Sequence, residues 1–243
     1  MPDQARPLLA VLIDADNASP KYAGAIFEEI AGLGEASVRR CYGDFSSQQM
    51  AGWNRVQAEH GLVPHHAPAN TVGKNASDIS LVIDAMDLLH TGRFDGFVLV
   101  SSDSDFTRLA SRIREQGLDV YGIGQKKTPA AFRKACKRFI FLENLGKSDS
   151  SDSAAGGADS DAGKAPVSPL AEARDRITKA MDALGREDDW IGLGEVGQYL
   201  TAADPDFDTR SYGHKKLSDL VKALKVLETR RNAGNQLQIR RID

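Results

Sequence analysis

The chain has 243 residues, of which 41% are hydrophobic and 27% are charged. These proportions are ordinary for a soluble globular protein, and the length suffices for one large domain or two modest ones. No apolar run approaches the roughly 18 residues that span a membrane, and the apolar stretch near the N-terminus is too short for a signal-peptide core. The net charge of −3 does not by itself indicate a nucleic-acid partner. The two cysteines, Cys41 and Cys136, lack metal-binding or redox spacing, so we expect reduced thiols in a cytoplasmic protein.

The predicted elements of the first part alternate between β-rich apolar runs and helical patterns. The runs that predict strands occupy residues 8–15, 36–43, 61–67, 94–102, 118–124 and 138–144. The helical patterns between them cover residues 19–32, 46–60, 77–91, 104–116 and 128–136. Several strands are apolar at consecutive positions, as in parallel sheets that are covered on both faces. The alternation predicts an α/β fold with a Rossmann-like, doubly wound and mainly parallel sheet.

The segment 146–169 differs sharply in composition from its surroundings. It consists mainly of Ser, Asp, Gly, Ala and Pro, and Val167 is its only larger apolar residue. Such a segment cannot offset the entropy of ordering by burying apolar surface. We therefore expect a flexible, acidic linker between a domain at residues 1–145 and a second domain at residues 170–243.

The second part begins with three helical patterns, at residues 170–185, 190–203 and 212–227. The tail that follows reads as two strands joined by a turn at 232–235, which contains Gly and Asn. Three helices and a terminal hairpin predict a small domain of the winged helix-turn-helix type.

Acidic residues gather where buried strands end. The stretch "LLAVLIDADNAS" places Asp14 directly after an apolar run, and "VLVSSDSDF" does the same with Asp103 and Asp105. Asp78 falls in the first turn of the helix predicted at 77–91. Ligands of doubly wound sheets bind at the carboxyl ends of the strands. Carboxylates packed together there repel one another unless a cation neutralises them, and a set of oxygen ligands without His or Cys points to Mg²⁺ or Mn²⁺.

Each acid also has a simpler interpretation. An isolated Asp after a strand is most often a helix N-cap or a turn former, and Asp105 could be an ordinary first-turn acid. We expect Asp16 to point to the other face, where its role could be simply to cap the following helix. Asp84 and Asp87 follow Asp78 by six and nine residues, and a helix turns by about 100° per residue, so neither shares the helix face of Asp78. We expect Asp87 on the solvated surface and leave the role of Asp84 undecided. The co-occurrence of two acidic strand ends favours a shared site.

The first part resembles the NYN domains, which are PIN-like nucleases that include the LabA-like bacterial proteins. The resemblance rests on "LIDADN", "KNASDISLVIDAM", "FVLVSSDSDFTRLASRIREQGLDVYGIG" and "FRKACKRFIFLEN" and spans most of residues 8–144. It implies metal-dependent RNA cleavage, in which water attacks phosphorus and one product keeps a 3′-hydroxyl. By this resemblance the catalytic residues are Asp14, Asn17, Asp78, Asp103 and Asp105. The same four aspartates would be the ligands of Mg²⁺ or Mn²⁺.

The family's usual Lys-Gly-x-Asp run departs from its pattern here. Lys74 and Asp78 are kept, but the run has one residue more and no glycine. The second part resembles the LOTUS (OST-HTH) domain, chiefly through "FDTRSYGHKKLSDLVKAL" at residues 207–224. That resemblance implies an RNA-binding winged helix, and such domains occur fused to NYN domains. We expect the partner to be RNA, either single-stranded or structured, and we expect no association with a membrane. The sequence leaves open whether the protein forms a homodimer.

The second domain is polarised in charge. Residues 209–243 hold nine Lys or Arg and three Asp or Glu, whereas residues 169–208 hold four Lys or Arg and ten Asp or Glu. A basic face of this kind makes salt-sensitive phosphate contacts, and a solvated helix face is the alternative. The candidate RNA-binding residues are Lys74, Lys215, Lys216, Lys222, Arg230 and Arg231. We expect structural roles for His65 and His66, and packing roles for Trp53 and Trp190, with a base-stacking platform as the alternative for the tryptophans.

Two other functions compete with a ribonuclease. A haloacid-dehalogenase-like phosphatase also begins with a strand followed by Asp-x-Asp, with the first Asp as a nucleophile that becomes phosphorylated. That family expects Thr or Val where this chain has Ala18, and a convincing lysine and a cap domain are missing. The other competitor is an RNA-binding adaptor whose acids are structural. Metal-dependent RNA cleavage separates the ribonuclease from the adaptor, and a trapped aspartyl-phosphate would identify the phosphatase.

Overall fold

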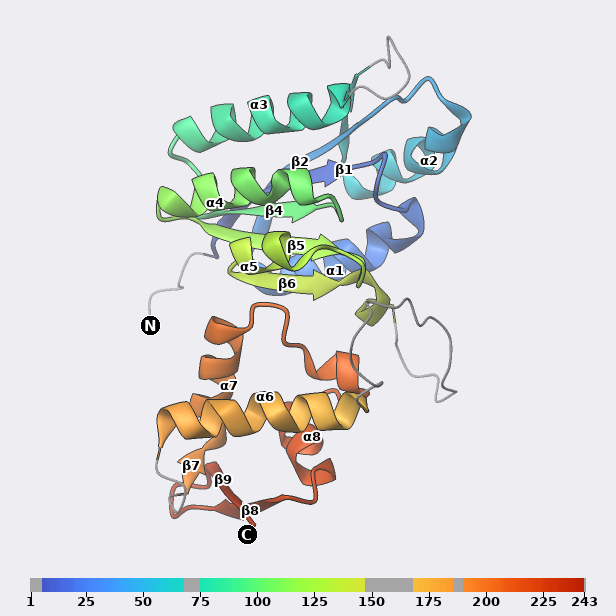
Figure 1. Ribbon diagram of the computed structural model, residues 1–243. Coiled ribbons are helices and arrows are strands. Elements are labelled where there is room, and N and C mark those ends of the chain that lie inside the picture. The colour runs from blue at the N-terminus through green and yellow to red at the C-terminus, as the bar shows by residue number, and fades with distance from the viewer. Residues whose placement is uncertain (1–5, 68–74, 147–167, 186–189, 243) are drawn as a thin grey trace. The chain divides into compact units, whose positions relative to one another are not determined.

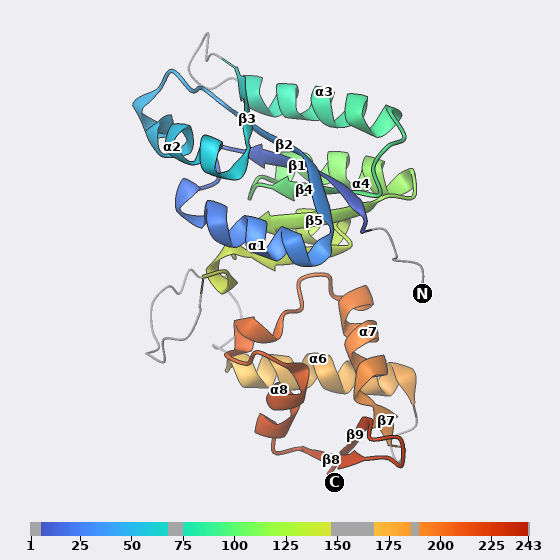
Figure 2. The ribbon, with the colours of Figure 1, turned by 180° about the vertical axis from the view of Figure 1, so that it is seen from behind.

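The structure is a computed structural model that describes residues 6–67, 75–146, 168–185 and 190–242. The chain divides into two compact units, Met1–Gly146 and Lys147–Asp243. Their elements are labelled in Figure 1 and seen from behind in Figure 2. The predicted linker at 146–169 lies outside the described residues except at its ends, and so does Lys74.

The first unit is built on one parallel sheet of six strands in the order β3-β2-β1-β4-β5-β6. The strands are β1 (Leu8–Asp14), β2 (Glu35–Gly43), β3 (Val63–His66), β4 (Gly96–Val100), β5 (Asp119–Gly124) and β6 (Arg138–Phe141). Each strand overlaps its predicted run, and the predicted α/β fold is confirmed. The run at 138–144 is a strand only to Phe141, because Leu142–Asn144 form a 3-10 turn. The strand order reverses between β1 and β4, and such a switch point is where doubly wound sheets bind ligands.

Helices cover both faces of this sheet, as the consecutive apolar residues of its strands predict. They are α1 (Ala23–Leu33), α2 (Ala51–His60), α3 (Ala76–His90), α4 (Thr107–Glu115) and α5 (Ala130–Ala135). One core contains Leu12 of β1 with buried residues of α3, α4 and α5, whereas Ile13 packs on the other face with residues of α1 and α2. Strand β1 is therefore buried on both sides, and its carboxyl end opens between the two layers.

Short 3-10 turns precede three of the helices and explain why the helices begin later than predicted. The turns are Pro20–Tyr22, Gln48–Met50 and Ser104–Phe106. In the predictions these residues belonged to the first turns of the helices at 19–32, 46–60 and 104–116. A 3-10 turn tightens the chain after a strand, so the side chains that follow β1 and β4 are held close to the sheet.

In its described residues, the second unit contains three α-helices and a three-stranded antiparallel sheet in the order β7-β9-β8. The elements are α6 (Pro169–Leu184), β7 (Ile191–Gly192), α7 (Leu193–Ala203), α8 (Leu217–Ala223), β8 (Leu227–Arg231) and β9 (Leu237–Arg241). The predicted hairpin is confirmed, and its turn contains Asn235 with a φ of 60°. Buried residues of all three helices pack with Ile191 and Ile239 of the sheet.

The helix predicted at 212–227 is wrong at both ends. A 3-10 turn at Thr209–Tyr212 ends at Gly213, whose φ of 81° lies in the left-handed region that glycine adopts without strain. Helix α8 begins only at Leu217, and Leu227 pairs with Arg241 as the first residue of β8. Among the described residues of both units, no helix has the length and apolar character needed to cross a membrane.

Candidate active site and nucleic-acid interface

Asp14 ends β1 at the switch point of the sheet and is 2% exposed. Its Oδ2 atom accepts a 2.7 Å hydrogen bond from the Ser101 hydroxyl, and its Oδ1 atom accepts a 3.2 Å bond from the backbone N–H of Asn17. Burial raises the pKa of Asp14 to about 7, the bonds from Ser101 and Asn17 oppose this rise, and the charges of Asp78 and Asp16 add to it. A carboxyl group with this pKa changes its charge near neutral pH.

The end of β4 is tied to Asp14 through Ser101. The Ser101 hydroxyl donates to Asp14 and accepts a 3.0 Å bond from the backbone N–H of Asp103. Asp103 caps the turn that follows, because its Oδ1 atom accepts from the backbone N–H of Asp105 at 2.9 Å. Asp103 therefore acts as a cap, which was the simpler interpretation of an Asp that follows a strand. Sequence reasoning missed the role of Ser101, although this serine follows a strand that neighbours β1.

Asp78 lies in the first turn of α3, as predicted, and its environment joins the two strand ends. Its pKa is raised, first by burial and then by the negative charges of Asp103, Asp16 and Asp105. Asp78 in turn raises the pKa of Asp14. The other three aspartates expected at the site, Asp14, Asp103 and Asp105, thus lie within electrostatic reach of Asp78. The four residues of this acidic cluster come from three separate elements.

Asp16 differs from its expected position. The sequence suggested that it points away from Asp14 and caps the following helix. In the structure its charge raises the pKa of both Asp14 and Asp78. Its Oδ1 atom lies 3.2 Å from the point where a Cβ atom at Gly43 would stand. Asp16 therefore lies within electrostatic reach of Asp14 and Asp78, contrary to the expectation that it points away.

The donor chemistry of this cluster fits a hard divalent cation, because every side chain in it offers carboxylate oxygens. Burial is the main cause of the raised pKa values of Asp14 and Asp78, and repulsion from neighbouring aspartates adds to it; a bound cation would relieve that repulsion. Within the described ranges, however, no three His, Cys, Asp or Glu side chains are grouped closely enough to hold a metal ion. The acids converge without forming a closed set of ligands.

Asp84, which the sequence left undecided, lies outside the cluster and fastens α3 to two strands. Its Oδ2 atom accepts hydrogen bonds from Arg40 and from the Tyr42 hydroxyl of β2, both at 2.8 Å. The same oxygen lies 3.1 Å from Nδ1 of His65 in β3, whose ring packs against Tyr42 at 5.0 Å between centroids. Burial lowers the pKa of His65, and the Asp84 charge opposes this shift. His65 thus has the structural role that was expected.

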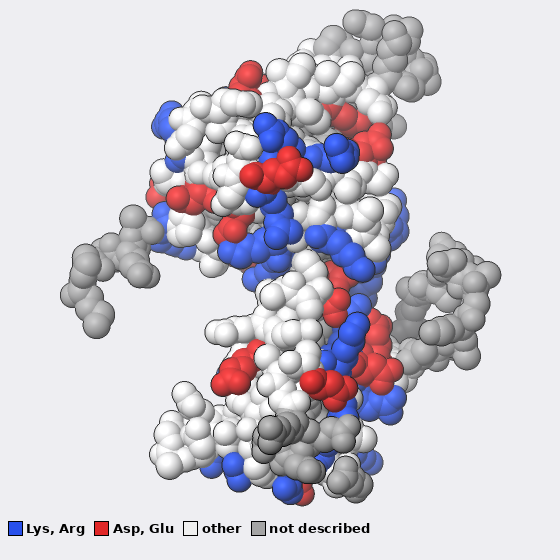
Figure 3. Space-filling view, turned by 60° about the vertical axis from the view of Figure 1, so that its left-hand side comes forward, with Lys and Arg blue, Asp and Glu red and all other residues white. Residues whose placement is uncertain are grey.

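The candidate RNA-binding residues of the second unit do not form one surface. Lys216 precedes α8 and lines a groove of about 730 Å³ together with Arg231 of β8 and residues of α7 and β9. Arg230 lies on the opposite face of the sheet, because consecutive strand residues point to opposite sides. Lys222 is exposed on α8, and Lys215 is exposed in the loop before it. Both signs of charge occur on the surface of each unit (Figure 3).

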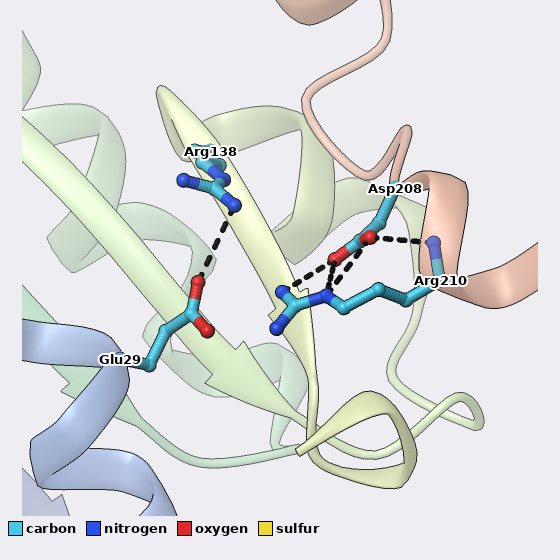
Figure 4. Close-up of polar contacts among 4 residues, drawn as sticks. All are labelled: Glu29, Arg138, Asp208 and Arg210. Carbon is cyan, nitrogen blue, oxygen red and sulfur yellow. Dashed lines mark hydrogen bonds and ion pairs between the residues drawn. The ribbon is translucent and has the colours of Figure 1, made fainter. Parts of the chain in front are cut away.

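Two ion pairs in Figure 4 show arginines that serve the fold instead. Arg138 of β6 pairs with Glu29 of α1 at 3.3 Å, which joins an edge strand to a covering helix. In the second unit, Asp208 accepts a 2.9 Å bond from the backbone N–H of Arg210 and pairs with its guanidinium at 2.6 Å. Arg210 is therefore neutralised locally by its own capping residue.

A doubly wound parallel sheet with acids at its switch point defines a Rossmann-like domain with a candidate hydrolytic site. The family model of the NYN domain matches residues 8–143, and the model of the OST-HTH/LOTUS domain matches residues 168–239. The first match covers more than half of the chain, so the chain belongs to the NYN domain family. NYN domains are part of the PIN-like nuclease superfamily. The resemblances seen in the sequence are confirmed.

Two solved structures are similar to parts of the chain. One is a protein of unknown function from Vibrio parahaemolyticus, with 18% identity over 58% of this chain and 96% of that one and a TM-score of 0.48. The other is an uncharacterized protein from Nitrosomonas europaea, with 32% identity over 40% of this chain and 93% of that one and a TM-score of 0.27. No curated protein matches the chain.

Proposed function

We propose that the chain is a metal-dependent ribonuclease, in which the NYN domain hydrolyses RNA phosphodiesters and the OST-HTH/LOTUS domain binds the RNA. The observation that carries the proposal is the buried Asp14 carboxyl, whose pKa is raised to about 7 at the switch point of the sheet. Membership of the NYN family supports the nuclease class. The second domain match supports RNA as the substrate.

The proposed site combines a charged set of ligands with groups that orient them. The ligands of Mg²⁺ or Mn²⁺ are Asp14, Asp78, Asp103 and Asp105. A divalent ion bound there supplies positive charge that offsets the phosphate and lowers the pKa of a water molecule. Ser101 fixes the orientation of the Asp14 carboxylate through its 2.7 Å hydrogen bond. Asn17, in the turn after β1, positions a water molecule or a phosphate oxygen beside it.

The second domain raises the concentration of RNA near the nuclease by holding it on the same chain. Positive side chains make phosphate contacts that are insensitive to sequence and weaken with salt. The residues proposed for these contacts are Lys215, Lys216, Lys222, Arg230 and Arg231 of the second domain, together with Lys74 of the first. Of these, Lys216 and Arg231 line the same groove.

An RNA-binding adaptor is the second candidate function. Within the described residues no three acids are grouped at metal-binding distance, which is the observation that favours it. In the adaptor the acids would only shape the turns, as Asp103 does when it caps the turn after β4. The phosphatase gains no such support, because the family match assigns the Asp-x-Asp strand end to an NYN domain.

The experiment that separates the two functions is cleavage of 5′-labelled single-stranded RNA in Mn²⁺, Mg²⁺ or EDTA. The wild type is compared with Asp14→Asn plus Asp103→Asn and with the control Asp87→Asn. Asp87 is a suitable control because it is an exposed aspartate on α3, the helix that carries Asp78. We expect metal-dependent cutting in the wild type and the control and none in the double variant. Equal background in all three proteins, with RNA still bound, would make the protein an adaptor.

A further inference from the structure

Trp190 lies against the outer face of the three-stranded sheet in the second unit. It directly precedes β7, whose Ile191 pairs with Ile239 of β9 and packs into the core. Strand alternation turns Trp190 to the opposite side. Arg230 of β8 and Arg240 of β9 lie on that side too, with their guanidinium carbons 4.1 and 4.9 Å from the centroid of the Trp190 ring.

The two arginines differ in how their charges are balanced. Arg240 forms a 2.9 Å ion pair with Glu228, and its Nε atom is buried without a hydrogen-bond partner among the described residues. Arg230 donates from Nε to Oε1 of Gln238 at 3.0 Å, which is a neutral acceptor. Within the described part of the unit, no carboxylate lies at ion-pair distance from Arg230. The exposed side chain of Arg230 therefore carries a positive charge that is available to an anion.

Packing alone does not account for the position of Trp190. The core of the second unit is built from other residues of its helices and strands, and Trp190 is only half-buried outside it. Trp53 in the first unit shows the contrast, because it is 1% exposed and its indole N–H donates to the carbonyls of Ala15 and Ala18. A large aromatic ring held at the surface beside two guanidinium groups resembles the surfaces on which proteins stack unpaired bases.

We propose that the face formed by Trp190, Arg230 and Arg240 binds a nucleotide of single-stranded RNA by stacking. The base stacks on the Trp190 ring or on the guanidinium plane that already lies over it, and both are flat partners for a nucleobase. Arg230 neutralises the phosphate of the same strand. This proposal deepens the proposed RNA binding and rests on it. It assigns base contacts to the outer face of the sheet, whereas Lys216 and Arg231 line the groove on the other side.

The test compares two probes of equal length, a labelled oligouridylate and a labelled ribose-phosphate oligomer that lacks bases. Fluorescence anisotropy of the full chain in EDTA, which prevents cleavage, gives the two affinities. In Trp190→Ala we expect roughly tenfold weaker binding of oligouridylate and unchanged binding of the abasic oligomer. Arg230→Gln weakens both probes, because it removes a phosphate contact. Trp190→Phe keeps a stacking ring and restores most of the lost affinity.

Tryptophan fluorescence provides a second readout that does not depend on an alanine variant. The chain has two tryptophans, and Trp53 is buried, so quenching that is present in the wild type and absent in Trp190→Phe reports a base on Trp190. Unchanged oligouridylate affinity in a folded Trp190→Ala, or equal quenching in the wild type and Trp190→Phe, overturns the stacking site and leaves RNA binding intact. If the wild type binds neither probe, RNA binding itself fails, and stacking fails with it.

Discussion

The Ser101 hydroxyl donates a 2.7 Å hydrogen bond to Oδ2 of Asp14 and thereby joins the carboxyl ends of β4 and β1. The same hydroxyl accepts from the backbone N–H of Asp103. One small side chain thus orders both acidic turns, and it does so through two bonds of opposite direction. A serine suits this position because its hydroxyl is both a donor and an acceptor.

Replacing this serine should change the charge state of the site. Ser101→Ala removes a bond that lowers the pKa of Asp14, so we expect the pKa to rise above its wild-type value of about 7 in the metal-free protein. NMR titration of the carboxyl carbon measures it. Ser101→Thr retains the hydroxyl and should restore the wild-type value. Ser111→Ala, which removes a hydroxyl bonded to the Thr107 carbonyl, should leave the pKa of Asp14 unchanged.

The metal-free protein should become more stable as the pH falls from about 8 to about 5. Burial raises the pKa of Asp14 from the ordinary aspartate value of 3.8 to about 7 in the fold, so the folded state binds the proton more tightly and unfolding becomes harder as protons are added. The pKa of Asp78 is shifted in the same direction. Asp14→Asn removes the largest part of this dependence. At pH 8 it should stabilise the metal-free fold by on the order of 2–4 kcal/mol.

Thermal unfolding in EDTA across this pH range measures the effect. We expect Asp14→Asn to be more stable than the wild type at pH 8 but not at pH 5. Equal stability of the two proteins at pH 8 would show that Asp14 is not held in a costly charged state. Asp87→Asn, which changes an exposed aspartate on α3, should follow the wild type at every pH.

A divalent cation should stabilise the protein through the acidic cluster. At a concentration of about one hundred times its dissociation constant, Mn²⁺ or Mg²⁺ should add about 2.7 kcal/mol to the free energy of unfolding of the wild type. Asp14→Asn plus Asp103→Asn should lose this gain, because it removes two of the proposed ligands. Unfolding with and without added metal at constant ionic strength measures it. A monovalent salt at matched ionic strength separates a specific divalent site from general screening.

Removing Asp84 should loosen the attachment of α3 to the sheet. Asp84→Ala leaves the buried Tyr42 hydroxyl without its acceptor and Arg40 without its carboxylate. We expect a loss of about 2–3 kcal/mol in the free energy of unfolding. Denaturant titration measures this loss, with Asp87→Ala on the same helix as the control, which should stay within about 0.5 kcal/mol of the wild type. A similar small loss in both variants would mean that the network adds little to the fold.

The groove residues should govern the salt dependence of RNA binding. Lys216→Ala and Arg231→Ala each remove one positive charge from the groove of the second unit. Each should therefore weaken RNA binding, and the negative slope of log affinity against log salt should become shallower by about one. Arg174→Ala removes a charge that pairs with Asp175 on α6 and should leave the slope unchanged. Equal slopes in all of these variants would place the phosphate contacts elsewhere on the chain.

Most of the first unit can be predicted from local sequence patterns. The six strands and the alternating helices follow from apolar runs and turn residues, and these patterns act over a few neighbouring positions. The strand-end positions of Asp14, Asp103 and Asp105 could be located in the same way, because an acid that follows an apolar run marks the end of a buried strand. The first-turn position of Asp78 was equally visible. The convergence of these four residues followed from the topology of parallel sheets.

The tertiary structure decided the features that depend on contacts between distant segments. Ser101 meets Asp14 because β1 and β4 are paired in one register, and no local pattern specifies which strands become neighbours. Asp16 acts on Asp78 because α3 packs against β1. The partners of Asp84 come from two other strands. Likewise, the basic residues of the second domain are visible in the sequence, but only the pairing of β9 with β7 and β8 brings Trp190, Arg230 and Arg240 together on one face of the sheet. Local preferences determine which elements form, whereas long-range pairing determines which side chains meet.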